Sequence, residues 1–370
     1  MTMPSTHMQR RKKAWHLAAL LAGSLLSVPT CAVTTTDNTP RWWCPLVAPS
    51  ATALDASVAD ALAHRHDQPH PMARVHTQGT LPHQGIHDES EQAEQDWTTA
   101  LHAAVAWRRT GNVELLDQVD RYLKAWSDIY QPSFNPIDET NLDQLFSAYV
   151  LTHDALTPAT RMAMARLIRS LGEGYIQRVE QHSGSTYIND INNWQSHRIK
   201  LIATAAAALN DPAMLTTARK LFLIQVAANI HTDGSTVDFA QRDALHYVTY
   251  DLQPLVQAAL AVSPYDAGKH WLPARSSTGS SVADALKWLA PYAEGRRTHQ
   301  EFVHTEEPFD IERRQAGLKG YDGIWNTHTS DAVYAYAAVL LPRYRPLTAR
   351  LGATPVELQT CAVSQTDNPR

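Results

Sequence analysis

Apolar residues in this chain recur mostly at helical spacing. Leu115, Val119, Leu123 and Trp126 lie three or four positions apart, which is the period of one helix face. Together with capping residues and prolines at helix starts, this spacing predicts helices at 51–64, 96–109, 114–129, 142–153, 158–180, 192–209, 212–230, about 242–263 and 331–341, and one capped by Ser281. Strand-like alternation is nearly absent, so we predict an all-α fold.

About ten or more helices of ordinary length predict an α/α toroid or superhelix, because so many paired helices exceed a four-helix bundle. The chain has no repeat of fixed period, which argues against a regular solenoid. Two polar segments interrupt the helices and should be loops. One is 68–86, rich in Pro, His and Gly, and the other is 131–141, which contains two prolines.

The first 32 residues have the pattern of an export signal. Four basic residues at 10–13 precede an apolar run from Ala14 to Val28, and Thr30-Cys31-Ala32 offers a small-residue cleavage site. We therefore expect a signal peptide at 1–32, one catalytic domain at 33–370, and a periplasmic or secreted protein.

Composition limits the possible partners and cofactors. Removing the leader from the 370-residue chain leaves 28 basic and 37 acidic residues, a net charge of −9, which argues against nucleic acid. The two remaining cysteines, Cys44 and Cys361, should form a disulfide in an oxidising compartment. No C-x-x-C or H-E-x-x-H motif occurs, and we expect no metal or other cofactor. We expect a monomer that, once the leader is removed, does not bind a membrane.

The polar stretch N-D-I-N-N-W-Q-S-H-R-I-K at 189–200 opens an alanine-rich apolar run. On a helix, Asn193 and His197 are four residues apart and share a face, with Lys200 beside them. An amide, an imidazole and an ammonium on one face can bind a carboxylate and move a proton. The alternative is a capped helix start with an exposed polar first turn.

A second polar face is predicted after residue 242. Arg242, His246 and Tyr250 follow one another at four-residue spacing, opposite an apolar face, and Tyr247 lies at the edge between the faces. Aromatic packing against a neighbouring helix is the alternative. With Asn193, these residues suit β-elimination from a uronic acid: an amide and a guanidinium neutralise the carboxylate, and a Tyr or His removes the C5 proton. Tyr247 is our candidate to protonate O4 and also to act as the C5 base, with Arg242 lowering its pKa; His197 and His246 are the alternative bases.

The chain resembles the alginate lyase family of polysaccharide lyases over about residues 90–340. The strings that carry the resemblance are F-N-P-I-D-E-T-N at 134–141, N-N-W-Q-S-H-R at 192–198 and R-D-A-L-H-Y-V-T-Y-D-L-Q-P-L at 242–255. The resemblance implies an incomplete α/α toroid that eliminates across uronate bonds. It also implies that Asn193 and Tyr247 are the catalytic Asn and Tyr, and that Arg242 stands near the family's Arg. Trp194 occupies the place where the best-known members have His, so the chain looks closer to relatives with N-N-W.

The expected substrate is an anionic polysaccharide, either polymannuronate (alginate) or polyglucuronate. The candidate substrate-binding residues are Asn135, Asp138, Glu139, Asn141, Asn192, Trp194 and Lys200. One alternative is a glycoside hydrolase, which needs two carboxylates across a cleft and could draw on Asp138, Glu139 and Asp243. The other is a sugar-binding toroid without activity.

Overall fold

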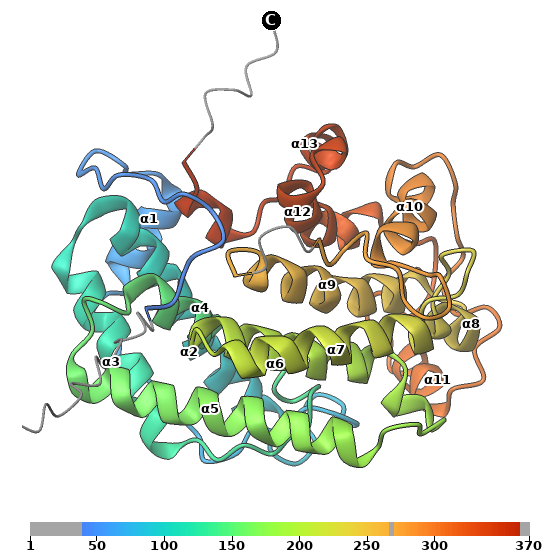
Figure 1. The fold of residues 1–370 in the computed structure, drawn as a ribbon, viewed down its shortest axis with the longest axis horizontal. Helices are drawn as coiled ribbons and strands as arrows, with labels where there is room; N and C mark the ends of the chain where they lie inside the picture. Colours follow the sequence, from blue (N-terminus) through green and yellow to red (C-terminus); the bar gives the residue numbers. More distant parts are fainter. Residues whose placement is uncertain (1–38, 266–269, 363–370) are drawn as a thin grey trace, which may run out of the picture. The chain divides into compact units, whose positions relative to one another are not determined.

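The computed structural model describes residues 39–265 and 270–362, and these residues form thirteen α-helices joined by loops and short 3-10 turns (Figure 1). The helices are α1 (Ala56–Ala63), α2 (His87–Thr110), α3 (Val113–Ile129), α4 (Asp143–Thr152), α5 (Pro158–Gln181), α6 (Asn193–Ala208), α7 (Pro212–Asn229), α8 (Val237–Arg242), α9 (Leu245–Val262), α10 (Val282–Ala293), α11 (Pro308–Gln315), α12 (Asp331–Leu340) and α13 (Arg345–Leu351). The described residues contain isolated β-bridges but no strand. The expected leader lies outside the described residues.

The helices form two rows. In the first row, α2, α4, α6, α9 and α12 each contact the next helix of the row. In the second, α3 contacts α5 and α5 contacts α7, and these helices also contact α2 or α6 of the first row. Two rows of paired helices are an incomplete α/α toroid, so the predicted fold class is confirmed.

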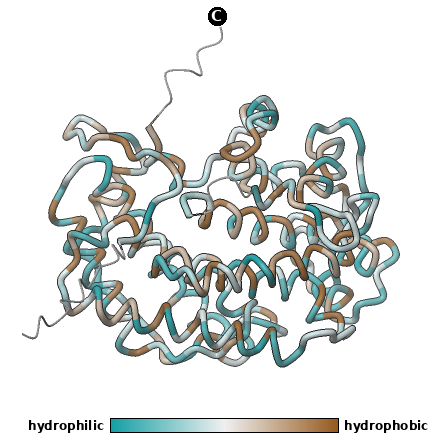
Figure 2. Tube along the Cα trace, viewed as in Figure 1, coloured by the Kyte–Doolittle hydropathy of each residue, from teal (hydrophilic) through white to brown (hydrophobic). Residues whose placement is uncertain are grey.

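Helix α6 is the most enclosed member of the first row. It contacts α4, α5, α7 and α9, and fourteen of its sixteen residues are buried. An alanine-rich helix can be surrounded in this way because small side chains let several neighbours approach closely. Figure 2 shows apolar residues along its neighbour α9. The polar first turn of α6 is also buried, so the alternative of an exposed first turn is wrong, although Asn192 does cap the helix.

Most predicted helix boundaries are confirmed to within one or two residues, notably for α3, α5, α6 and α7. Helix α1 starts later than predicted, because Asp55 caps it by accepting a hydrogen bond from the Val58 N–H. Helix α2 starts earlier, at His87. A continuous helix from 242 is wrong. Arg242 ends α8, Asp243 takes a left-handed conformation with φ 48°, and α9 begins only at Leu245.

A disulfide joins Cys44 to Cys361, with their Cα atoms 5.6 Å apart. Backbone hydrogen bonds reinforce this junction: the Val47 N–H donates to the Thr360 carbonyl and the Ala362 N–H to the Pro45 carbonyl, both at 2.8 Å. The bond closes a loop of more than three hundred residues, so it restricts the unfolded chain strongly.

We expect Cys361→Ser to lower the free energy of unfolding by about 2–4 kcal/mol. Thermal denaturation measures this loss. A reducing agent should lower the melting temperature of the wild type to that of the variant and leave the variant unchanged. Two titratable thiols in the native exported protein would contradict this prediction.

Candidate active site

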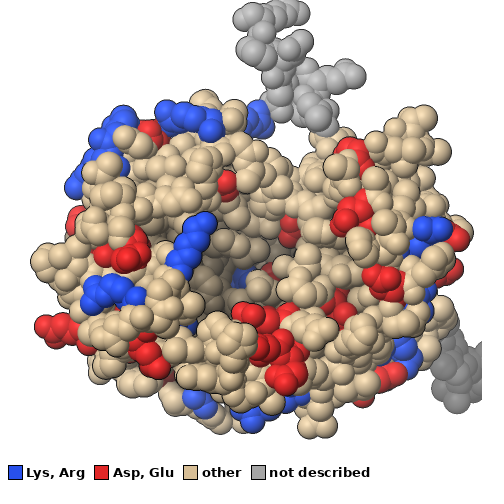
Figure 3. Space-filling model, turned by 180° about the vertical axis from the view of Figure 1, so that it is seen from behind, with Lys and Arg blue, Asp and Glu red and all other residues tan. Residues whose placement is uncertain are grey.

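A cavity of about 580 Å³ lies where the start of α6 faces α8, α9 and α11. Its lining includes Asn192, Asn193, Trp194, Arg242, His246, Tyr247, Tyr250, Glu307, Arg313 and Tyr321. The structure therefore brings together residues from 78 to 321, and it unites five of the six predicted catalytic residues. Figure 3 shows the molecule from the side opposite to Figure 1, and this side has a hollow with basic side chains at its rim and within it.

The hydroxyl of Tyr247 is held by charged groups on three sides. It accepts hydrogen bonds from Arg242 Nη2 at 2.7 Å and from Arg313 Nη1 at 3.0 Å, and it donates to Asp310 Oδ1 at 3.1 Å. Arg242 is in turn fixed by a bidentate ion pair with Asp310, and its guanidinium lies over the Tyr247 ring. This geometry holds the phenol group in one orientation, with its proton directed at Asp310.

The pKa of Tyr247 is raised well above its ordinary value, and burial is the main cause. Arg242 and Arg313 act in the opposite direction, while Tyr321 and Asp310 add to the rise. Arg242 does lower this pKa, as expected, but loss of hydration outweighs the two cations, so the pKa is raised overall. Near neutral pH the side chain is a protonated phenol, which suits a proton donor.

Asn193 is fixed at the first position of α6 by a buried carboxylate. Its backbone N–H donates to Asp238 Oδ2 at 2.8 Å, and its side-chain amide donates to Asp238 Oδ1. Burial raises the pKa of Asp238, and the hydrogen bonds from Asn193 oppose this rise. Since one amide hydrogen is engaged by Asp238, the rest of the amide group is left for the cavity that Asn193 lines.

The two candidate histidines occupy different environments. His246 lines the cavity between Tyr247 and Tyr321, with ring centroids 5.1 and 5.4 Å away. Burial, helped by Arg313, lowers the pKa of His246 to about 4. His197 is not among the cavity-lining residues; its Nδ1 contacts Thr140 Oγ1 at 2.6 Å, and its ring lies against Tyr250. Burial also lowers the pKa of His197, so both imidazoles are neutral near pH 7.

Glu301 holds the start of the helix that carries the phenols. Helix α9 has no side-chain cap of its own, and Glu301 accepts the N–H groups of Leu245 at 2.8 Å and His246 at 3.0 Å. A carboxylate at this place satisfies two of the free N–H groups of the helix start. Glu301 thereby fixes the first turn of α9, which contains His246 and Tyr247.

Several predicted substrate-binding residues have internal roles instead. Asp138 is buried and accepts the N–H groups of Thr77 and Gln78, and Glu139 accepts hydrogen bonds from buried Tyr130 and Tyr175. Lys200 is buried and pairs with Asp143 at 2.9 Å. Asn141 is exposed and does not line the active-site cavity. Asn135 lines a second cavity that adjoins the first. Asn192 caps α6 by accepting a hydrogen bond from the Trp194 N–H. Asp138 and Glu139 were expected to bind substrate, but the loop turns both side chains inward.

The sequence interpretation missed the residues that approach from the far end of the chain. Asp310 and Arg313 lie on α11 and Tyr321 follows it, about 63 to 74 residues after Tyr247. The string P-F-D-I-E-R-R at 308–314 is an available signal, since Pro308 marks a helix start and two arginines follow. The 308–314 segment is too short to show a clear apolar face, so the sequence does not indicate which part of the fold it packs against.

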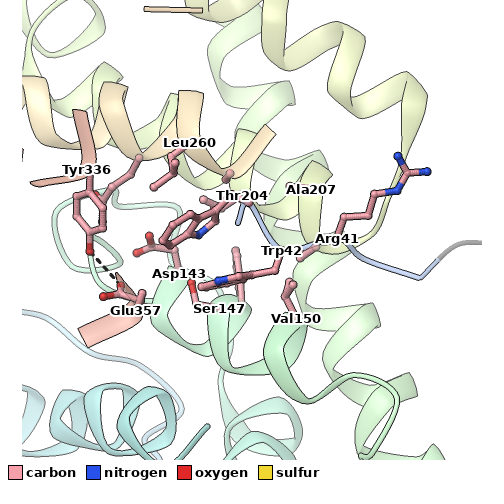
Figure 4. Close-up of a pocket in the computed structure, with 15 residues that line it drawn as sticks. Arg41, Trp42, Asp143, Ser147, Val150, Thr204, Ala207, Leu260, Tyr336 and Glu357 are labelled. Atoms are coloured by element: carbon pink, nitrogen blue, oxygen red, sulfur yellow. Dashed lines mark hydrogen bonds between the residues drawn. The ribbon is translucent and has the colours of Figure 1, made fainter. Parts of the chain in front are cut away.

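The smaller cavity in Figure 4 is not a second reaction site. It measures about 50 Å³ and lies between the segment around Trp42 and helices α4, α6 and α9. Both of its carboxylates are already engaged: Glu357 Oε1 accepts a hydrogen bond from the Tyr336 hydroxyl at 3.0 Å, and Asp143 pairs with Lys200. In the described parts of the chain, no group of three His, Cys, Asp or Glu side chains could hold a metal ion, and no helix is long and apolar enough to cross a membrane.

The two-row helical fold is that of an α/α toroid, and the match to a family model places the chain in the polysaccharide lyase class. Residues 47–299 match the family model for alginate lyase, so the chain belongs to the alginate lyase family and is a polysaccharide lyase. A search of curated proteins gave no match.

Solved structures with a similar fold include three structures of two alginate lyases. An alginate lyase from Bacteroides ovatus shares 16% identity at a TM-score of 0.52, covering 75% of both chains. A histidine-to-alanine variant of alginate lyase A1-III, complexed with a tetrasaccharide, shares 14% identity at 0.57, covering 85% of this chain and 91% of the other. Alginate lyase A1-III from Sphingomonas species A1 shares 13% identity at 0.54, covering 84% and 91%.

Proposed function

We propose that this enzyme cleaves a β-linked polyuronate, polymannuronate or polyglucuronate, by β-elimination between C5 and O4. The observation that carries the proposal is the Tyr247 hydroxyl, bonded to Arg242 and Arg313 in a cavity that also contains Asn193 and a neutral His246. Elimination needs a neutralised carboxylate, a base and an acid, and this cavity supplies a group for each.

Arg313 and Asn193 are the groups that bind the uronate carboxylate beside the reacting carbon. Arg313 has no carboxylate within ion-pair distance in the described parts of the chain, whereas Arg242 is already paired with Asp310. A guanidinium and an amide reduce the charge of the carboxylate and stabilise the enolate-like intermediate. Tyr247 then protonates O4 as the bond between O4 and C4 breaks.

His246 is the base in this proposal, in place of Tyr247. Its imidazole is neutral, lines the cavity and lies beside the acid, whereas Tyr247 keeps its proton. In β-linked mannuronate and glucuronate the C5 hydrogen and O4 lie on the same face of the sugar ring. Two neighbouring side chains of one helix turn can therefore serve as base and acid for either polymer, which differ at C2.

The base assignment predicts the pH dependence of the reaction. With His246 as base, kcat/KM should be flat from about pH 5 to 9 and fall below about pH 4, where the imidazole becomes protonated. With a Tyr247 phenolate as base, kcat/KM should instead rise about tenfold per pH unit across the neutral range, because the pKa of the phenol is raised. Initial rates measured from pH 3.5 to 9 distinguish the two, with circular dichroism at each pH to verify that the protein is folded.

Incubation with a panel of polyuronates tests the function itself. A lyase produces an unsaturated product that absorbs ultraviolet light, a hydrolase produces reducing ends without this absorbance, and a binder produces neither. The hydrolase alternative lacks its carboxylate pair, because Glu307 is the one carboxylate among the cavity-lining residues and Asp138, Glu139 and Asp243 lie elsewhere. Reducing ends without absorbance would nevertheless overturn the lyase proposal.

We also propose that the enzyme is exported and that it belongs to a particular subgroup of the family. Residues 1–32 are removed as a signal peptide, leaving one catalytic domain in the periplasm or medium, and N-terminal sequencing of the exported protein tests this. Because Trp194 follows Asn193, we propose that the chain groups with N-N-W relatives and that its imidazole comes from His246.

A further inference from the structure

A second cavity, of about 590 Å³, adjoins the active-site cavity. The two share Gln78 and Trp194 in their linings, so the indole of Trp194 stands at the passage from one to the other. The proposed elimination does not use this second cavity. A polymer that crosses the first cavity would extend into the second over an aromatic ring, and sugar rings pack well on such surfaces.

The second cavity is lined by three arginines and by no acidic side chain. The arginines are Arg74, Arg178 and Arg198. Arg74 and Arg178 are exposed, and neither has a hydrogen-bond or ion-pair partner in the described parts of the chain. Unpaired guanidiniums in one cavity favour an anion with a planar, two-oxygen group such as a carboxylate.

Arg198 is built into the wall. It is 3% exposed, donates from Nη1 to the Asn189 carbonyl at 2.7 Å and to Gln195 Oε1 at 2.9 Å, and its buried Nε has no hydrogen-bond partner in the described residues. Its nearest carboxylate is Asp190, at 3.5 Å. Burial lowers the pKa of Arg198, Asp190 opposes this, and the positive charge of Arg178 adds to the fall. Two close cations with one acidic partner leave positive charge for a ligand.

One face of α5 forms the other wall. Gly174, Gln177, Arg178 and Gln181 all line the cavity and recur at three- and four-residue spacing, so they share one helix face. Gly174 has to be small, because a Cβ there would meet the Phe134 ring at 2.1 Å. The ring therefore packs directly on α5 and holds the 133–136 segment, with Asn135, beside the arginines. The amide side chains can bind sugar hydroxyls between the charged groups.

We propose that this second cavity is a binding subsite for another uronate unit of the same polymer, with Arg178 and Arg74 binding its carboxylate and Trp194 contacting its ring. The inference rests on the proposed polyuronate substrate. It adds a site away from the reacting bond, which raises affinity and selects chains long enough to reach it.

Kinetics and binding of Arg178→Ala test the subsite. On the polyuronate that the wild type cleaves, KM should rise about tenfold or more while kcat is retained, because the reacting groups lie in the other cavity. In a Tyr247→Phe background, calorimetry should show about 10–100-fold weaker binding of mannuronate or glucuronate tetrasaccharides when Arg178 is also replaced. Carboxyl-reduced tetrasaccharides should bind equally with and without Arg178. Arg166→Ala is the matched control, since Arg166 is an exposed arginine of the same helix outside the cavity.

The outcomes separate this inference from the proposed function. If the wild type eliminates a polyuronate but Arg178→Ala behaves like Arg166→Ala in both assays, the subsite is wrong and the lyase stands. If no polyuronate is cleaved, the proposed function fails, and tetrasaccharide binding that depends on Arg178 still supports the subsite. No tetrasaccharide binding to the parent protein overturns it.

Discussion

Tyr247→Phe should lower kcat by about 10²–10⁴ and leave the fold unchanged. The substitution removes the hydroxyl that can protonate O4, and a positioned proton donor is typically worth this much. The ring stays between Phe302 and Tyr250, and Arg242 keeps its two contacts with Asp310, so no buried charge is left without a partner. The melting temperature should therefore stay close to that of the wild type.

Tyr250→Phe is the matched control, because Tyr250 lines the same cavity one turn along α9. Burial raises the pKa of Tyr250 to about 12, and its hydroxyl has no guanidinium contact comparable to that of Tyr247. An active Tyr247→Phe beside an inactive Tyr250→Phe would transfer the acid role to Tyr250.

A substrate that needs no acid separates the two possible roles of Tyr247. In a uronate with fluorine at C4 in place of the O4-linked sugar, the leaving group is fluoride, which is stable as an anion and needs no proton from the enzyme. If Tyr247 is the acid and His246 the base, Tyr247→Phe should eliminate fluoride nearly as fast as the wild type. If Tyr247 is also the base, the loss should persist with the fluoride substrate.

The sequence predicted the fold and the first half of the site because both depend on local patterns. Asn192 followed by a polar turn and an apolar run marks the start of α6, and the structure places this start at Asn193. The break after Arg242 was missed, because a left-handed Asp243 has no signature in a pattern of apolar positions. Arg242 and Tyr247 still meet, but from two helices and not along one.

The missing parts of the site are long-range. Asp310 and Arg313 meet Tyr247 only because α11 folds back over the start of α9, and no local spacing reports such an approach. Charged residues were also assigned to the cavity from their polarity or from their place on a helix face. Asp138 and Lys200 show why this fails, because polar groups inside the protein also need hydrogen-bond partners. Asp138 accepts a backbone N–H of a neighbouring loop, and Lys200 donates to the buried carboxylate of Asp143.

The second large effect is expected from Asn193→Ala, which should lower kcat by about 10²–10³. The variant loses an amide beside the carbon where negative charge develops, and one such donor typically contributes this factor. The backbone N–H of residue 193 still donates to Asp238, so α6 keeps its first contact and the protein should remain folded. Turnover and melting temperature, measured together, give the result.

The neighbouring Asn192→Ala supplies the contrast, since it removes a cap and not the amide that Asp238 orients. Losing the bond from the Trp194 N–H to the Asn192 side chain should cost about 1 kcal/mol of stability, with a much smaller change in kcat. Two adjacent asparagines then separate by turnover: Asn193→Ala lowers kcat strongly, whereas Asn192→Ala lowers stability with little loss of turnover. Near wild-type turnover in a folded Asn193→Ala would remove Asn193 from the reaction and leave Arg313 as the main group neutralising the carboxylate.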